Sequence, residues 1–185
     1  MLEILIVIII VGLLAVVAFA IGIYNKLVRL QNLADEGLSG IDVQLKRRYD
    51  LIPNIVETVK GYATHEKETL TKIVELRNSA MAVSDPADKL ETENQITESL
   101  KTIFALAENY PDLKASENFK QLQNNLNEIE DAIQNSRRYY NGTVRELNTS
   151  IQTFPTNILA GIFSVKSRKF FEAGEGERDN VKVSF

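Results

Sequence analysis

The sequence predicts an all-α fold, in which an N-terminal transmembrane helix continues into a bundle of long helices. Two observations support this prediction. An uninterrupted apolar run near the N-terminus is long enough to cross a bilayer. Beyond this run, apolar residues recur every three or four positions over most of the chain, which is the spacing of helices that bury one face. Strand-like alternation is rare.

Residues 4–23 form the apolar run, and none of them carries a charge. A helix of this length measures about 30 Å, which matches the hydrocarbon thickness of a bilayer. A cleaved signal peptide is the alternative, because Ala18-Phe19-Ala20 resembles a cleavage site. However, a signal peptide normally has Lys or Arg before its apolar region, and no such residue precedes this run. We therefore predict a membrane anchor over residues 1–25 that contacts the lipid bilayer through residues 4–23.

The charges beside the anchor predict its orientation. Glu3 is the only charged residue before the apolar run, whereas Lys26 and Arg29 follow it closely. Because Lys and Arg accumulate on the cytoplasmic side of membrane spans, the rest of the chain is predicted to lie in the cytoplasm. Within the run, Ala18 and Gly22 form a small-residue pair that could mediate helix–helix contact, although such pairs are common in any transmembrane helix.

Residues 26–171 are predicted to form the helical domain. The apolar stripe of its first segment extends from Leu38 towards Met81 and is stopped by Asp85-Pro86. The next segments cover about 87–109 and 119–151, and proline-containing breaks follow both. No segment can bury its stripe alone, so the segments are expected to pack together as a bundle.

Pro53 lies in the middle of the first segment and removes one helical N–H. One interpretation starts a new helix here, with Asp50 as its N-cap. The other keeps a single helix that kinks at Pro53. The apolar residues from Leu45 to Val59 stay in register across the proline, which favours the kinked helix.

The end of the chain divides in two. Residues 156–171 are apolar with Lys166, Arg168 and Lys169 near their end, and they are predicted to pack as a short helix or, alternatively, to lie on the anionic leaflet. Residues 172–185 combine an acidic linker with a strand-like tail, in which Val181, Val183 and Phe185 share one side. That tail could dock on a partner protein.

Several kinds of chemistry are disfavoured by composition. Cysteine is absent, which excludes disulfides, thiolate metal sites and a cysteine nucleophile. The only histidine, His65, lies near Glu66 and Glu68, but no second ligand pair accompanies it. The net charge of −4 argues against a nucleic-acid partner. We therefore expect no metal, no cofactor and no catalytic activity.

Two basic-aromatic motifs stand out, "KRRY" at 46–49 and "RRYY" at 137–140. Arginine forms bidentate pairs with carboxylates and stacks on tyrosine, so these motifs are predicted to lock helices together or to form an interface between subunits or partners. Contact with anionic lipid headgroups is a third possibility. The predicted lock residues are Arg47, Arg48, Tyr49, Arg137, Arg138 and Tyr139, with Asp42, Asp50, Glu128 and Asp131 as candidate partners.

Four separate stretches closely resemble the LemA family of bacterial membrane proteins: "YNKLVRLQN", "IDVQLKRRYDLIPNIVETVKGYATHE", "RRYYNGTVRELNTSIQTFPTNILAGIF" and "VKVSF". The resemblance covers nearly the whole chain. It implies a single N-terminal transmembrane helix followed by an antiparallel domain of four-helix-bundle type, in the inner membrane of a bacterial cell. It implies no active site.

The leading functional hypothesis is a membrane-anchored helical scaffold, without catalytic activity, that self-associates into a homo-oligomer and engages other membrane proteins. An adaptor for a membrane enzyme or protease, docking through residues 181–185, is the second hypothesis. A metal- or ligand-dependent enzyme is the third.

Overall fold

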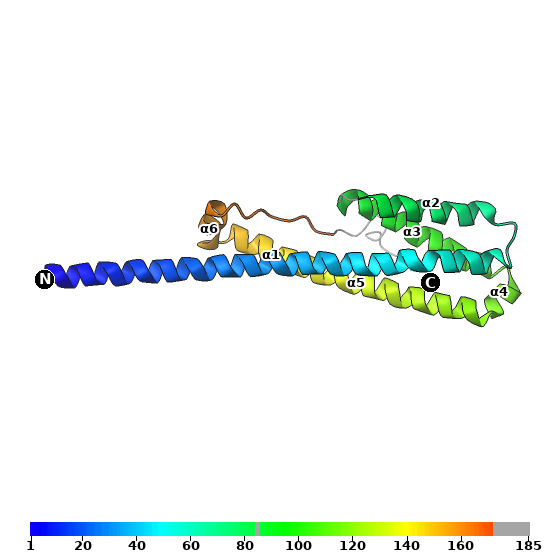
Figure 1. Cartoon of the computed structure of the whole chain (residues 1–185), viewed down its shortest axis with the longest axis horizontal. Coiled ribbons are helices and arrows are strands. Elements are labelled where there is room, and N and C mark those ends of the chain that lie inside the picture. The colour runs from blue at the N-terminus through cyan, green and yellow to red at the C-terminus, as the bar shows by residue number, and fades with distance from the viewer. Residues whose placement is uncertain (84–85, 172–185) are drawn as a thin grey trace, which may run out of the picture. The chain divides into compact units, whose positions relative to one another are not determined.

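The computed structural model describes residues 1–83 and 86–171, except for the side chains of residues 86–90. Every regular element in this part of the chain is a helix (Figure 1), so the predicted all-α class is confirmed. The elements are α1 (Leu2–Lys60), α2 (Lys67–Ala82), α3 (Pro86–Ala107), α4 (Pro111–Ala115), α5 (Glu117–Gln152) and α6 (Thr156–Ile162).

The helices form two compact units. The first contains Met1–Ser39 and Arg137–Phe170, and the second contains Gly40–Ser136. Helices α1 and α5 are long enough to contribute residues to both units. The predicted boundary of the membrane anchor at residue 25 stays a prediction. The predicted tail, with Val181, Val183 and Phe185, lies outside the described residues.

Two of the predicted helices agree with the structure to within a few residues at each end. Helix α3 covers nearly the predicted range of 87–109, and α5 extends the predicted range of 119–151 by a few residues. The break between them holds the short helix α4, which begins at Pro111. Proline is favourable in the first turn, because the N–H that it lacks would have no helical acceptor there. The prolines therefore mark the helix boundaries that the sequence indicated.

The prediction of one helix from Leu38 towards Met81 is wrong, because the chain turns at residues 61–66. The amides of Tyr62 and Ala63 both donate to the carbonyl of Val59, at 3.0 and 2.8 Å, and end α1. Periodicity did not reveal this turn for a simple reason. Val59, Ala63 and Leu70 are all buried, and their spacings of four and seven keep the helical phase across the break.

The second unit is built from the C-terminal part of α1, from α2 and α3, and from the N-terminal part of α5, which lie alongside one another (Figure 1). Each helix buries one apolar stripe, as its amphipathic pattern requires. The rings of Phe104 and Phe119 also pack against each other, with centroids 5.5 Å apart. The buried stripe residues include Ile41, Leu45, Ile52, Ile55, Val59, Leu70, Ile73, Ile96, Leu100, Ile103, Phe119, Leu126, Ile129 and Ile133.

The first unit packs α1 closely against the C-terminal part of α5. A Cβ on Gly37 would lie 3.1 Å from the Cα of Tyr140, so the two backbones approach closely at this point. Tyr140 is buried, and its hydroxyl donates to the carbonyl of Lys169 at 3.0 Å. Asn148 exchanges two hydrogen bonds, of 2.8 and 2.9 Å, with the backbone of Arg168. These bonds fasten the segment that follows α6 along α5.

Helix α1 continues through Pro53 as one helix. Because proline has no N–H, the carbonyl of Tyr49, four residues earlier, lacks its helical donor. Arg77 on α2 supplies the missing donor, since its Nε lies 2.7 Å from this carbonyl oxygen. Pro53 and Arg77 thus form a functional pair, in which one residue frees an acceptor and the other satisfies it. A kink at Pro53 stays a prediction.

This pairing makes the effect of Arg77→Met depend on residue 53. With Pro53 present, Arg77→Met should lower the free energy of unfolding by about 1.5–3 kcal/mol, because a charge-assisted hydrogen bond is lost and its acceptor is left unpaired. With Pro53→Ala present, the new amide bonds to the Tyr49 carbonyl, and Arg77→Met should cost at least about 1 kcal/mol less. Urea unfolding of the four proteins measures the coupling, and equal costs in both backgrounds would show that the pair is not coupled.

Candidate functional site

The most unusual feature of the second unit is the side chain of Arg48, which is 0% exposed. Arginine is almost never fully buried without a partner. Nη1 donates to Oε1 of Glu130 at 2.8 Å and to Oγ1 of Thr97 at 2.9 Å. Nη2 pairs with Oε2 of Glu93, whose side chain is also fully buried. The guanidinium of α1 is therefore bonded to both α3 and α5.

Tyr49 completes this group, which we name the Arg48 cluster (Arg48, Tyr49, Glu93, Thr97 and Glu130). The hydroxyl of Tyr49 donates to Oε1 of Glu93. Burial raises the pKa of Tyr49, with Arg48 opposing and Asp42 reinforcing the shift. The phenol therefore stays protonated and remains a donor at neutral pH. Thr97 is held in turn, because its hydroxyl donates to the carbonyl of Glu93 at 3.1 Å.

The contacts of the Arg48 cluster indicate a structural role. Arg48 and Glu93 are sealed from solvent, so neither side chain can contact a ligand that approaches from outside. Burying two charges costs several kcal/mol per ion, which their mutual attraction offsets only when geometry and hydrogen bonding are good. What such a pair does supply is selectivity, because sliding one helix against another would leave a buried charge without its partner. The cluster joins α1, α3 and α5 within the second unit, and we infer that it helps to set their alignment.

The partners of Arg48 are not those that sequence reasoning named, since Glu93 and Glu130 were not among the candidates. A signal for both buried ions was nevertheless present. Arg48 continues the spacing of Leu45 and Ile52, and Glu93 continues the stripe that leads to Ile96. A charged residue in an apolar stripe indicates burial with a partner.

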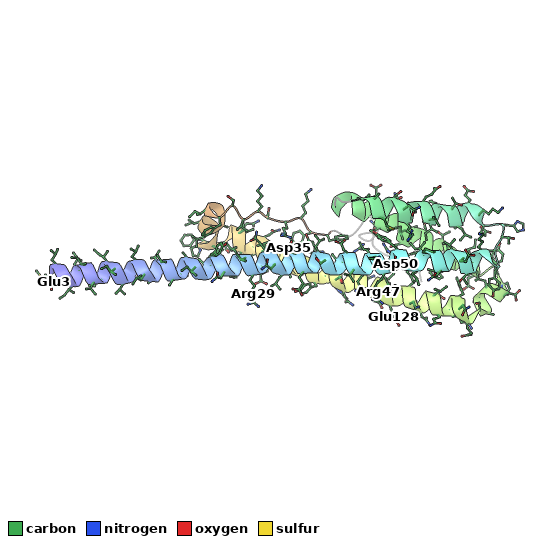
Figure 2. The ribbon with its side chains drawn as sticks, in the orientation of Figure 1. Glu3, Arg29, Asp35, Arg47, Asp50 and Glu128 are labelled. Carbon is green, nitrogen blue, oxygen red and sulfur yellow. The ribbon has the colours of Figure 1, made fainter. Side chains whose placement is uncertain are left out.

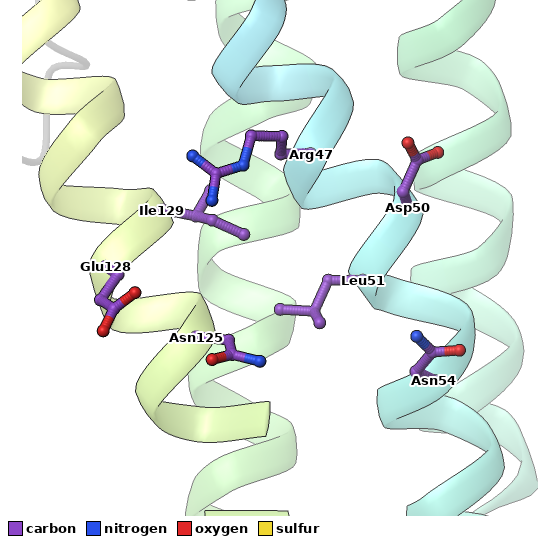
Figure 3. Close-up of a pocket in the computed structure, with 7 residues that line it drawn as sticks. All are labelled: Arg47, Asp50, Leu51, Asn54, Asn125, Glu128 and Ile129. Atoms are coloured by element: carbon purple, nitrogen blue, oxygen red, sulfur yellow. The ribbon is translucent and has the colours of Figure 1, made fainter. Parts of the chain in front are cut away.

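Arg47 lies in a different environment from its neighbour Arg48. Its side chain is exposed, and its Nη1 donates to Oε1 of Gln44 at 3.0 Å. Figure 3 shows Arg47 reaching from α1 towards Ile129 on α5, beside an open cavity of about 410 Å³. The remaining lining residues are Asp50, Leu51, Asn54, Asn125 and Glu128. This set offers polar and charged contacts to a partner.

The "RRYY" motif lies in the first unit, whereas "KRRY" lies in the second. Arg138 and Tyr139 are exposed, Arg137 is partly buried, and Tyr140 alone is packed in the core. The proposed interface role of Arg137, Arg138 and Tyr139 therefore stays a prediction. The histidine, His65, is exposed in the turn after α1, and the described residues include no group of three or more side chains suited to holding a metal ion.

The start of α1 is the other notable feature of the first unit. Residues 1–19 are all exposed, although the most apolar window of this helix has a mean hydropathy of 3.5. Figure 2 shows side chains on all sides of the helix between Glu3 and Arg29. Among the helices that the structure describes, α1 is the one long and apolar enough to cross a membrane.

The Arg48 cluster predicts large and non-additive effects of substitution. Arg48→Met leaves Glu93 buried without its cation and should lower the free energy of unfolding by about 3–5 kcal/mol. The double variant R48M/E93Q removes the uncompensated charge and should recover part of this loss. Arg47→Met, the exposed matched control, should stay within about 0.5 kcal/mol of the parent. Equal costs for R48M and R47M in denaturant titrations would contradict the role assigned to the cluster.

Known proteins are similar to this chain over most of its length. The LemA family model matches residues 37–185. Protein LemA from Metamycoplasma hominis is 32% identical over 165 residues, covering 89% of this chain and 75% of that protein. Magnetosome protein MamQ 2 from Paramagnetospirillum magneticum is 22% identical over 192 residues, covering 88% of this chain and 71% of its own length. The first two similarities confirm the motif resemblance, and the chain belongs to the LemA family.

Proposed function

We propose that this protein is a membrane-anchored helical scaffold that self-associates and engages other membrane proteins, without catalytic activity. The observation that carries the proposal is the continuity of α1. One helix begins with a run that is apolar on every face and ends as a core helix of a packed unit. Water is an unfavourable solvent for the first part, whereas hydrocarbon suits it. The helix is thus suited to connect a bilayer to a folded unit.

The charges after the apolar run support an orientation in which the helical units lie in the cytoplasm, at the inner membrane of a bacterium. Lys26 and Arg29 are both exposed and follow the run directly, whereas Glu3 precedes it. This asymmetry is the one that the positive-inside rule describes. Protease digestion of intact cells and of permeabilised cells would distinguish the two orientations.

Self-association within the membrane is supported by the surroundings of the small residues. A Cβ added to Gly22 would meet no atom within 4 Å, so packing inside the chain does not require a glycine there. Ala18 lies one helical turn earlier on the same face. Small residues four apart allow two membrane helices to approach closely. We therefore place a contact between copies on the face that contains Ala18 and Gly22.

A non-catalytic role also suits the diversity of the relatives, which are named as LemA in one case and as magnetosome proteins in others. A helical scaffold is a role that such different relatives can share. The alternative of an adaptor that docks through residues 181–185 is a separate proposal. Deleting these five residues should change the set of co-purifying proteins if the adaptor proposal holds and leave it unchanged if it does not.

The anchor proposal predicts that charge in the apolar run abolishes membrane retention. Leu13→Arg/Leu14→Arg should shift the protein from the alkali-washed membrane pellet to the supernatant, because each central arginine raises the cost of insertion by about 2.5–3.5 kcal/mol. The matched control, Leu13→Ala/Leu14→Ala, should remain in the pellet. Extraction of the unaltered protein by alkaline wash would contradict the anchor.

The self-association proposal predicts a difference between two faces of the same helix. Ala18→Leu/Gly22→Leu should abolish association in nanodiscs or detergent, because large side chains separate the helices. Ala20→Leu, which lies about 200° around the helix from both positions, should leave association unchanged. Native mass spectrometry measures the subunit number, and a monomeric parent protein would contradict the self-association part of the proposal.

A further inference from the structure

Helix α6, in the first unit, exposes large apolar side chains. Ala160 is its buried residue, whereas Ile158 is 55% and Ile162 is 67% exposed. These two isoleucines are four residues apart and therefore share one side of the helix. Phe154, just before the helix, is 80% exposed. Several exposed apolar side chains in one short segment are typical of an interaction site.

The position of α6 places this surface next to the apolar run of α1. The ring of Phe163, which follows α6, contacts the ring of Tyr24 with centroids 4.7 Å apart. Tyr24 comes directly after the run at residues 4–23, so α6 ends at the level where that run ends (Figure 1). If residues 4–23 cross the bilayer, α6 lies at the boundary between acyl chains and headgroups.

The charge pattern around α6 also suits a membrane surface. Residues 153–165 contain no charged side chain, so no charge in this segment opposes contact with an apolar medium. Lys166 and Lys169 follow directly and are exposed, as is Lys26 on α1. Arg168, between the two lysines, pairs instead with Asp35 at 2.5 Å. Apolar side chains next to exposed lysines are the combination by which interfacial segments bind anionic leaflets.

We propose that the segment from Phe154 to Phe163 is a second membrane contact, which inserts its apolar side chains into the leaflet where the span of α1 ends. The proposal rests on the membrane anchor proposed above. It assigns the exposed apolar side chains to lipid rather than to a second copy of the chain, because the adjacent Phe163 contacts Tyr24 at the end of the apolar run and exposed lysines follow. Attachment at two points would restrict rotation of the first unit about α1.

Depth measurements on the full-length protein can test this proposal. The chain contains no cysteine, so one introduced cysteine carries a fluorescent label without background. The labelled variants are Leu13→Cys in the span, Ile158→Cys and Ile162→Cys on the apolar side of α6, and Asn157→Cys as the exposed polar control on the same helix. Each is placed as a single copy in nanodiscs that contain lipids with a nitroxide either near the headgroup or near the bilayer centre, and iodide probes access from water.

The proposal predicts that shallow nitroxide quenches the labels at 158 and 162 several-fold more than the label at 157. Iodide should show the reverse order. Replacing zwitterionic lipid by anionic lipid should increase the shallow quenching at 158, and Lys166→Gln/Lys169→Gln should remove that increase. The label at 13 should respond most to the deep nitroxide.

Two results would overturn the proposal while leaving the anchor intact, and in both the label at 13 is quenched by lipid. In the first, the labels at 158 and 162 are quenched by iodide as strongly as the label at 157. In the second, these labels are shielded from both quenchers, which means that protein covers the surface. If instead the label at 13 is open to iodide, the anchor itself fails, and with it the proposed function.

Discussion

The constraint on which the rest of this structure depends is the change along α1 from an exposed apolar run to a helix that buries one face. Residues 4–19 are apolar and exposed, whereas later residues of α1 bury one stripe against other helices. Burial of apolar surface is the main favourable term in folding, and α1 obtains it from protein only in its second part. Under the proposed anchor, a bilayer would supply the equivalent term for the first part. The apolar run ends just before Tyr24, so the proposal places the membrane boundary there.

Polar groups in the core of the second unit determine how its helices align. Two helices that pack through apolar stripes can shift along each other, since one isoleucine can take the place of another in the contact. The Arg48 cluster disfavours such a shift, because its hydrogen bonds join specific residues of α1, α3 and α5. The bond from Arg77 to the carbonyl freed by Pro53 adds α2 to the same arrangement. Arg48 and Arg77 thus link α1, α2, α3 and α5 through hydrogen bonds at residues 48 and 49 of α1.

The parts of the fold that depend on periodicity could be predicted from the sequence. Helix α5 is long and its apolar pattern is regular, so its extent was predicted to within a few residues. The turn at residues 61–66 was missed, because Ala63 and Leu70 happen to preserve the helical phase. The ion pairs between Arg48 and carboxylates on other helices were missed for another reason. Which carboxylate meets Arg48 depends on the axial alignment of α1, α3 and α5, and no local pattern contains that information.

The candidate sites, like the fold, could be predicted from the sequence only in part. The sequence singled out Arg48 and Tyr49 because basic-aromatic motifs are unusual, but it did not separate buried Arg48 from exposed Arg47. The spacing of Leu45, Arg48 and Ile52 could have separated the two arginines, because it places Arg48 in the apolar stripe. For residues 156–171 packing was preferred over membrane contact. The exposure of Ile158 and Ile162 could be seen only once the fold had shown which face of α6 the first unit covers.

The most direct test of the account is a cysteine accessibility scan along α1 in native membranes, using a water-soluble maleimide. The account predicts that every position from 4 to 23 is unreactive. From residue 26 onward, exposed positions such as Arg29 and Glu36 should react, and buried positions such as Leu27, Leu30 and Ala34 should not. A reactive face within residues 4–23 would mean that the run is in contact with water, and it would contradict the claim that α1 joins a bilayer to a helical scaffold.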